Sequence, residues 1–263
     1  MTEGMKASRT VTLQGGKALV LLTLFVFLAF GLRMGLRALG TGHWLQSHGF
    51  GAGAFLYLFI LCGLVLIVAI TMALRRTGLP GALLELGVLP IGLRGILVAL
   101  LSVAVMIPVV LISGRAFNTT AIATIISRDT VGPFAEEILF RGFLFRQFRR
   151  WADIPFWIAA VLSSLVFAYG HLYEGHTLLT SLEAAGVTFV GGILFCWLTE
   201  RWGNLWPAIV IHAGLDLVWM TFQLGDNAVG DLVANVARLA ALAVAIAGTL
   251  FFTSSRLTPL PYK

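Results

Sequence analysis

The chain has 263 residues, of which 59% are hydrophobic and 11% are charged, and its formal net charge at pH 7 is +6. Soluble globular domains carry about a quarter charged residues. This composition therefore excludes a disordered chain, a nucleic-acid-binding domain and an ordinary cytosolic enzyme. The two cysteines, Cys62 and Cys196, lie inside apolar runs, which excludes a disulfide framework and a cysteine-based metal site. We expect an all-α, polytopic membrane protein.

Apolar runs along the chain indicate the membrane spans. A hydrocarbon core about 30 Å thick requires about 20 apolar residues at a rise of 1.5 Å each. Three runs meet this length. Four further runs are shorter or are interrupted by polar residues, and a last run follows them. In order, the runs are Ala18–Leu36, Gly51–Leu74, Gly95–Gly114, Thr130–Phe148, Ile154–His171, Leu182–Leu198, Leu205–Phe222 and Leu232–Phe252. The sequence thus predicts a bundle of about eight helices that forms one membrane domain over residues 1–263.

Two segments near the first spans need separate interpretation. The first run follows Lys6, Arg9 and Lys17, and we expect it to be an uncleaved anchor because two arginines interrupt the region where a signal peptidase would cut. Residues Gly78–Leu93 contain two prolines and one acid, which favours an interfacial segment between the second and third spans.

The distribution of basic residues predicts the orientation in the membrane. With the N-terminus inside, twelve of the 18 lysines and arginines fall in inner segments, four fall in outer segments, and Arg141 and Arg238 lie within spans. Cytoplasmic loops carry the excess of basic residues. We therefore expect both termini in the cytoplasm, with a bacterial inner membrane as the location.

The fourth span contains two acids and a base, although ionisable groups inside a membrane are costly and usually functional. Glu137 and Arg141 are four residues apart, so they share a helix face and can neutralise each other. Glu136 points about 100° away and needs another partner or a proton. This asymmetry favours a structural ion pair beside a reactive base. The alternative is a pair that only locks the helix, beside a protonated Glu136.

Two later spans add imidazoles and a third acid. The fifth span ends at His171, and the seventh contains His212 and Asp216, again four residues apart. The aspartate can fix the imidazole tautomer or join it at one site. His171 alone, and the pair of His212 and Asp216 alone, would more often be structural. His176 is expected to be a loop residue. The joint occurrence on three short helices is what favours a functional site.

Two hydrolytic mechanisms fit these residue types. In one, Glu136 is a general base for water while the histidines polarise a carbonyl and stabilise the oxyanion. In the other, some of Glu136, His171, His212 and Asp216 bind Zn²⁺, which acidifies a bound water. The chain has no His-Glu-x-x-His zinc helix and no Gly-x-Ser-x-Gly elbow. Residue types alone do not distinguish between these two mechanisms. We expect no obligatory metal.

Three ordered motifs resemble those of a known family. They are Glu136-Glu137-x-x-x-Arg141, Phe167-x-x-x-His171 and His212-x-x-x-Asp216. In this order they are similar to the motifs of the CAAX protease and bacteriocin-processing (CPBP, or Abi) membrane family, which includes the Ras-converting enzyme of eukaryotes. The resemblance covers about Gly132–Met220, and the first three spans match only in being apolar.

The resemblance implies a fold, an activity and residue roles. The family is a bundle of roughly eight helices that cleaves peptide bonds near the C-termini of substrates. By its pattern Glu136 activates water, His171 and His212 complete the site, Arg141 braces the glutamate helix, and Phe167 packs beneath the site. Ras-converting enzymes carry asparagine where this chain has Asp216, and an ionised aspartate cannot donate to an oxyanion. Asp216 must therefore be protonated, orient His212 or help to bind metal.

The sequence therefore predicts an intramembrane endopeptidase acting near the C-terminus, or on the leader, of a membrane-anchored protein or peptide. Its partners would be that substrate and the lipid bilayer, without nucleic acid. One alternative is a non-catalytic scaffold or bacteriocin-immunity protein of the same fold. Another is a proton- or ion-coupled transporter, which is disfavoured because the acids cluster in one place and no half-to-half repeat is visible.

Overall fold

The computed structural model describes residues 2–51, 53–115, 117, 130–225 and 227–254, with side chains from Gln14 onward. All regular elements in these residues are helices, so the predicted all-α fold is confirmed. The first half contains α1 (Thr2–Val26), the π-helix η1 (Phe27–Gly31), α2 (Leu32–Ala38), α3 (Thr41–Ser47), α4 (Ala54–Arg75), α5 (Leu79–Leu86), α6 (Leu93–Ala104) and α7 (Met106–Ile112). The second half contains helical residues 130–136, the π-helix η2 (Glu137–Phe145), α9 (Arg146–Arg150), α10 (Phe156–Tyr169), the 3₁₀ turn η3 (Leu172–Glu174), α11 (Leu178–Trp202), α12 (Trp206–Phe222) and α13 (Leu232–Thr253).

Among the described residues, six helical segments are long and apolar enough to cross a membrane. They are Gln14–Ala38, Ala54–Arg75, Leu93–Ile112, Phe156–Glu174, Leu178–Trp202 and Leu232–Thr253. They correspond to six of the eight predicted spans, and the protein is an integral, multi-pass membrane protein. The other two predicted spans are helical as well, but Thr130–Phe148 carries several charges and α12 has only 17 residues. The count of eight spans is therefore not confirmed.

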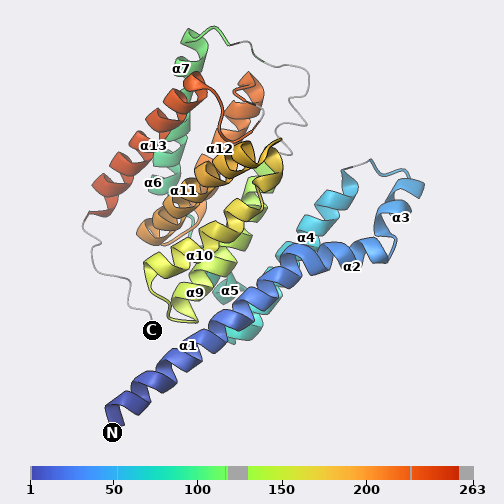
Figure 1. Cartoon of the computed structure of the whole chain (residues 1–263), viewed down its shortest axis with the longest axis vertical. Coiled ribbons are helices and arrows are strands. Elements are labelled where there is room, and N and C mark those ends of the chain that lie inside the picture. Colours follow the sequence, from blue (N-terminus) through green and yellow to red (C-terminus); the bar gives the residue numbers. More distant parts are fainter. Residues whose placement is uncertain (1, 52, 116, 118–129, 226, 255–263) are drawn as a thin grey trace.

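The helices fall into a main bundle and a side group. Figure 1 shows α6, α10, α11, α12 and α13 gathered together, while α2, α3 and the beginning of α4 stand to one side of them. Within the bundle α10 packs on α11, and α6 packs on both α12 and α13. The π-helix η2 contacts α1, α4, α5, α10 and α11. It therefore connects α1, α4 and α5 to α10 and α11 of the bundle.

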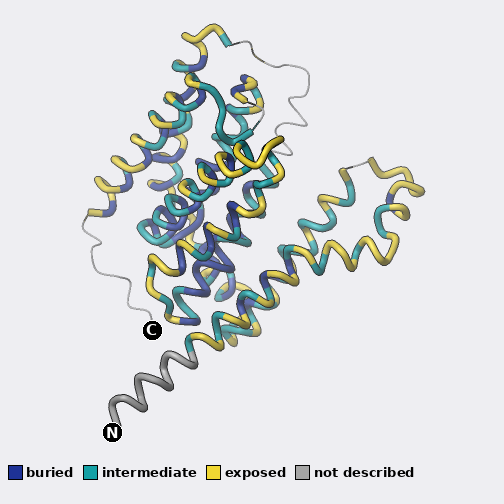
Figure 2. The backbone as a smooth tube through the Cα atoms, in the orientation of Figure 1, coloured by how far each residue is buried: buried dark blue, intermediate teal, exposed yellow. Residues whose placement is uncertain are grey.

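The core is centred on η2 and the helices around it. Seven of the nine η2 residues are buried, and Figure 2 shows buried segments concentrated inside the bundle while α2 and α3 are largely exposed. A Cβ atom at Gly142 would lie 2.9 Å from the backbone oxygen of Leu86. Glycine at this position therefore permits α5 to approach η2 closely. A run of π-helix is rare in proteins and often accompanies a functional site.

The predicted interfacial segment contains the short helix α5, which packs onto this core. Ala82 and Leu86 are fully buried, and the side chain of Arg146 donates to the backbone oxygens of Glu85, Leu84 and Gly203 at 2.9–3.1 Å. These bonds satisfy carbonyls at the ends of α5 and α11 that have no partner within their helices. The segment is anchored to protein, and its position relative to the membrane surface stays a prediction.

Basic side chains tie the helix ends together at one end of the molecule. Lys17 donates to the oxygen of Trp151 at 2.8 Å, Arg75 donates to that of Arg150 at 3.1 Å, and Arg149 binds Glu200 at 2.7 Å. We call this the basic end. The opposite end is formed by η3, the beginning of α11, the end of α12 and the beginning of α13.

Candidate active site

A buried ion pair lies at the beginning of η2. Arg141 Nη1 donates to Glu137 Oε1 at 2.9 Å, and both side chains are almost completely removed from solvent. The guanidinium carbon of Arg141 also lies 4.1 Å from the ring centre of Phe167 and 5.2 Å from that of Phe195. Aromatic faces attract cations, so these rings add to the stabilisation of the buried charge. The predicted pairing of Glu137 with Arg141 is confirmed.

The same glutamate oxygen accepts a second hydrogen bond, from another helix. His212 Nδ1, in the middle of α12, lies 2.8 Å from Glu137 Oε1. The bond orients the imidazole and directs Nε2 away from Glu137. Sequence reasoning missed this contact because the two residues are 75 positions apart and lie on different helices. The spacing of residues within either motif does not indicate a contact between Glu137 and His212.

Two carboxylates that are open to solvent face His212 Nε2. Glu136 Oε2 lies 3.9 Å from this nitrogen and Asp216 Oδ2 lies 3.8 Å from it. Their side chains are 42% and 44% exposed, whereas that of Glu137 is 0% exposed. Consecutive glutamates therefore have different surroundings, one inside the bundle with a counter-ion and the other facing a cavity. Asp216 joins the imidazole at one site, which was one of its two expected arrangements, and Glu137 makes the hydrogen bond that orients the ring.

His171 lies two residues after the end of α10 and also contacts the Phe167 ring. Its Nδ1 is 2.9 Å from the backbone oxygen of Phe167, and its Nε2 is 3.9 Å from Glu174 Oε1. The Phe167 ring centre lies 4.6 Å from that of His171 and 5.9 Å from that of His212. Phe167 thus contacts both imidazoles and Arg141, which agrees with the packing position expected for it.

A cavity of about 1450 Å³ connects these groups. Glu136, His171, His212 and Asp216 line it together with Phe167. Its other wall comes from η1 and α4 and is mainly apolar, with Leu28, Ile60, Leu64 and Ile67. The cavity therefore combines a polar wall that carries the motif residues with an apolar wall from η1 and α4. Glu137 and Arg141 lie behind the polar wall.

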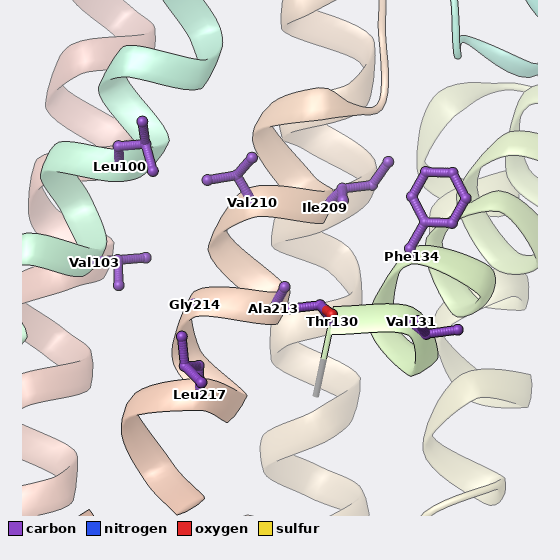
Figure 3. A pocket seen from close by; sticks show the side chains of 10 residues that line it. All are labelled: Leu100, Val103, Thr130, Val131, Phe134, Ile209, Val210, Ala213, Gly214 and Leu217. Carbon is purple, nitrogen blue, oxygen red and sulfur yellow. The ribbon is translucent and has the colours of Figure 1, made fainter. Parts of the chain in front are cut away.

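A second cavity, of about 510 Å³, lies on the other side of helix 130–136 and α12. Figure 3 shows its apolar lining, with Phe134 facing Ile209 and with Val103 and Leu100 on the neighbouring helix. No titratable side chain is found among the described residues that line it. The motif residues belong to the first cavity.

The four residues considered for zinc do not form a metal site in this arrangement. Within the described ranges, no group of three or more histidine, cysteine, aspartate or glutamate side chains is placed to hold a metal ion.

Comparison with family models agrees with this geometry. Residues 118–218 match the family described as "Type II CAAX prenyl endopeptidase Rce1-like". The matched segment contains all the motif residues, from Glu136 to Asp216, although its first twelve residues lie outside the described part of the chain. Comparisons with curated proteins and with solved structures found no match. Over the segment that carries the three motifs, the resemblance to the CAAX protease family is therefore confirmed.

Proposed function

We propose that the protein is an intramembrane endopeptidase that hydrolyses a peptide bond near the C-terminus, or in the leader, of a membrane-anchored protein or peptide. The family match supports a CAAX-type endopeptidase in general. The observation that carries the proposal is the position of His212. This imidazole is bonded to a buried glutamate on one side and faces two cavity carboxylates on the other.

Glu136 is the general base in this proposal. Its carboxylate is open to the cavity, where water can reach it, and no arginine or lysine among the described residues forms an ion pair with it. Glu136 takes a proton from water, and the oxygen of that water attacks the scissile carbonyl carbon. The proton then passes to the leaving amine as the carbon–nitrogen bond breaks. Glu137 is not suited to this role, because its side chain is 0% exposed and its Oε1 already accepts from the arginine and the imidazole.

The imidazoles stabilise the negative charge that develops on the carbonyl oxygen. His212 donates Nδ1–H to Glu137, so Nε2 can donate to an oxyanion when the ring is an imidazolium. Glu136 and Asp216 near Nε2, with Glu137 at Nδ1, surround this cation with negative charge. Asp216 thus acts on the site through His212, without itself donating to the oxyanion. His171 is held at Nδ1 by the Phe167 carbonyl, and its Nε2 lies 3.9 Å from Glu174 Oε1 in the same cavity.

The cavity also supports the proposed class of substrate. A peptide attached to the membrane must bring an apolar anchor and a polar backbone into one site. The wall formed by η1 and α4 offers apolar contacts to the anchor, while the polar groups of α10 and α12 face it. The anchor already lies among lipid tails, so these contacts stabilise the complex through packing and not through removal of apolar area from water.

The basic end supports the proposed orientation. Lys17, Arg75 and Arg149 gather there, whereas His171 directly precedes η3 at the opposite end. If the basic end is cytoplasmic, as basic loops usually are, both chain ends are inside and the site opens in the outer half of the bilayer. In a bacterial inner membrane, this orientation suits removal of a C-terminal anchor from an exported protein.

Proteolysis of a tagged membrane substrate by purified protein in detergent or vesicles tests the function. We expect Glu136→Gln to lower turnover by about 10²–10⁴-fold, the usual contribution of general-base catalysis, without a change in folding. Glu183→Gln is the matched control, because Glu183 is an exposed acid at the beginning of α11. Near-normal turnover by Glu136→Gln would refute its role. No cleavage by the wild type of any membrane-anchored substrate would favour the scaffold or immunity alternative.

A further inference from the structure

Arg238 is a charged residue of α13 that the proposed mechanism does not use. It is the only lysine, arginine, aspartate or glutamate within Leu232–Thr253, and ionisable residues inside membrane spans are costly unless they have a function. Its side chain is half-buried and lines the same cavity as Glu136 and His212. The guanidinium group thus faces the space that a substrate would occupy.

The guanidinium group of Arg238 is held in place by neutral groups. Nη2 donates to the backbone oxygen of Ala228 at 2.6 Å, and Nη1 lies 3.4 Å from Asn235 Oδ1. Its central carbon lies 4.5 Å from the ring centre of Trp219. In the described part of the chain, no carboxylate lies within ion-pair distance of it, whereas Arg115 nearby is paired with Asp231. Arg238 is therefore oriented without being neutralised by these residues, as a site for an anion requires.

The other charges of the cavity restrict where an anionic group can bind. Glu136, Asp216 and Glu174 repel an anion, and Glu174 is also engaged with the backbone nitrogen of Ala228. A second cavity arginine, Arg33, lies on α2, in the side group. Arg238 differs from it because its hydrogen bonds and its stacking on Trp219 fix its direction.

The distance from the candidate active site suggests which anion this is. Trp219 follows His212 by seven residues on α12, a separation of about 10 Å along the axis at 1.5 Å per residue. An extended peptide covers 3.3–3.6 Å per residue, so about three residues span this distance. We propose that Arg238 is a specificity-determining residue for the proposed cleavage near a C-terminus, and that it binds the terminal carboxylate of the substrate. This inference rests on the proposed function. It adds the direction in which the substrate peptide binds, with the substrate's C-terminus towards the beginning of α13.

Binding of product-length peptides to an inactive enzyme tests the inference without turnover. In a Glu136→Gln background, the affinities of one membrane-anchored peptide with a free C-terminal carboxylate and of its C-terminal amide are compared. We expect the carboxylate form to bind about tenfold or more tightly, and Arg238→Gln to remove this difference by weakening only the carboxylate form. Arg94→Gln is the matched control, because Arg94 is exposed at the start of α6. Arg238→Lys, which keeps the charge, should retain part of the preference.

Several outcomes would overturn the inference. Equal affinity of the two peptides for the parent enzyme would do so, as would equal weakening of both by Arg238→Gln, which indicates only a structural role. Loss of the preference in Arg33→Gln but not in Arg238→Gln would assign the anion to the other wall. If the wild type cleaves acid and amide substrates equally well, the endopeptidase function stands and only this inference fails. If it cleaves neither, the proposed function itself fails.

Discussion

Replacement of Arg141 by methionine tests whether the buried ion pair stabilises the site. Methionine keeps much of the apolar contact with Phe167 and Phe195 but removes the guanidinium group that binds Glu137 Oε1 at 2.9 Å. Glu137 has 0% side-chain exposure, so it is left as a buried charge with only His212 as a partner. We therefore expect a large loss of stability as well as a loss of activity.

The magnitude follows from known costs of breaking a buried pair. Removal of one partner destabilises a protein by about 3–5 kcal/mol. For a chain of this size each kcal/mol lowers the melting temperature by about 2–4 °C. The expected decrease is thus roughly 6–20 °C. The double variant Glu137→Gln/Arg141→Met has no stranded charge, and its glutamine oxygen can still accept from His212, so we expect it to recover at least half of this loss.

Thermal unfolding in detergent, followed by intrinsic fluorescence, measures these effects. Arg94→Met is the control, and because Arg94 is exposed we expect a change within about 0.5 kcal/mol. An unchanged melting temperature for Arg141→Met would refute the reasoning. A double variant that loses as much as the sum of the two single variants would also contradict it, because coupled partners are not additive.

Three further predictions concern packing, orientation and metal. Gly142→Ala places a Cβ 2.9 Å from the Leu86 oxygen, and we expect it to lower the free energy of unfolding by about 1–3 kcal/mol. Gly186→Ala is the control, because a Cβ there has nothing within 4 Å and should not destabilise the protein. Equal melting temperatures of the two variants would contradict the close approach of α5 to η2. Orientation can be tested by cysteine labelling in a variant without Cys62 and Cys196. A cysteine at position 176 should react with a membrane-impermeant reagent from outside the cell, whereas a cysteine at position 150 should react only after permeabilisation. The reverse pattern would place the site in the cytoplasmic half of the membrane. The predicted topology also places Asp226 on the outer side, and this residue lies outside the described part of the chain. Chelation should leave proteolysis unchanged, and about one zinc per active chain would reverse this expectation.

Sequence by itself determined the features that depend on composition and on contacts along a single helix. Hydrophobicity identified the membrane fold, and residue spacing predicted the pair of Glu137 and Arg141, because residues four apart share a helix face. The three motifs identified the family segment. The exact number of spans was not accessible in this way, since a short helix and a charged helix do not meet the length and polarity expected of a span.

Only the tertiary structure decided the contacts between helices. It gave Glu137, and not Asp216, the hydrogen bond to His212 Nδ1, and it placed Phe167 against both imidazoles. It also brought Arg238 from the last helix into the cavity of Glu136. These contacts depend on which helices are neighbours and how they are rotated about their axes. Apolar runs of similar composition do not encode that choice locally, because it arises from the fit of side chains across the whole bundle.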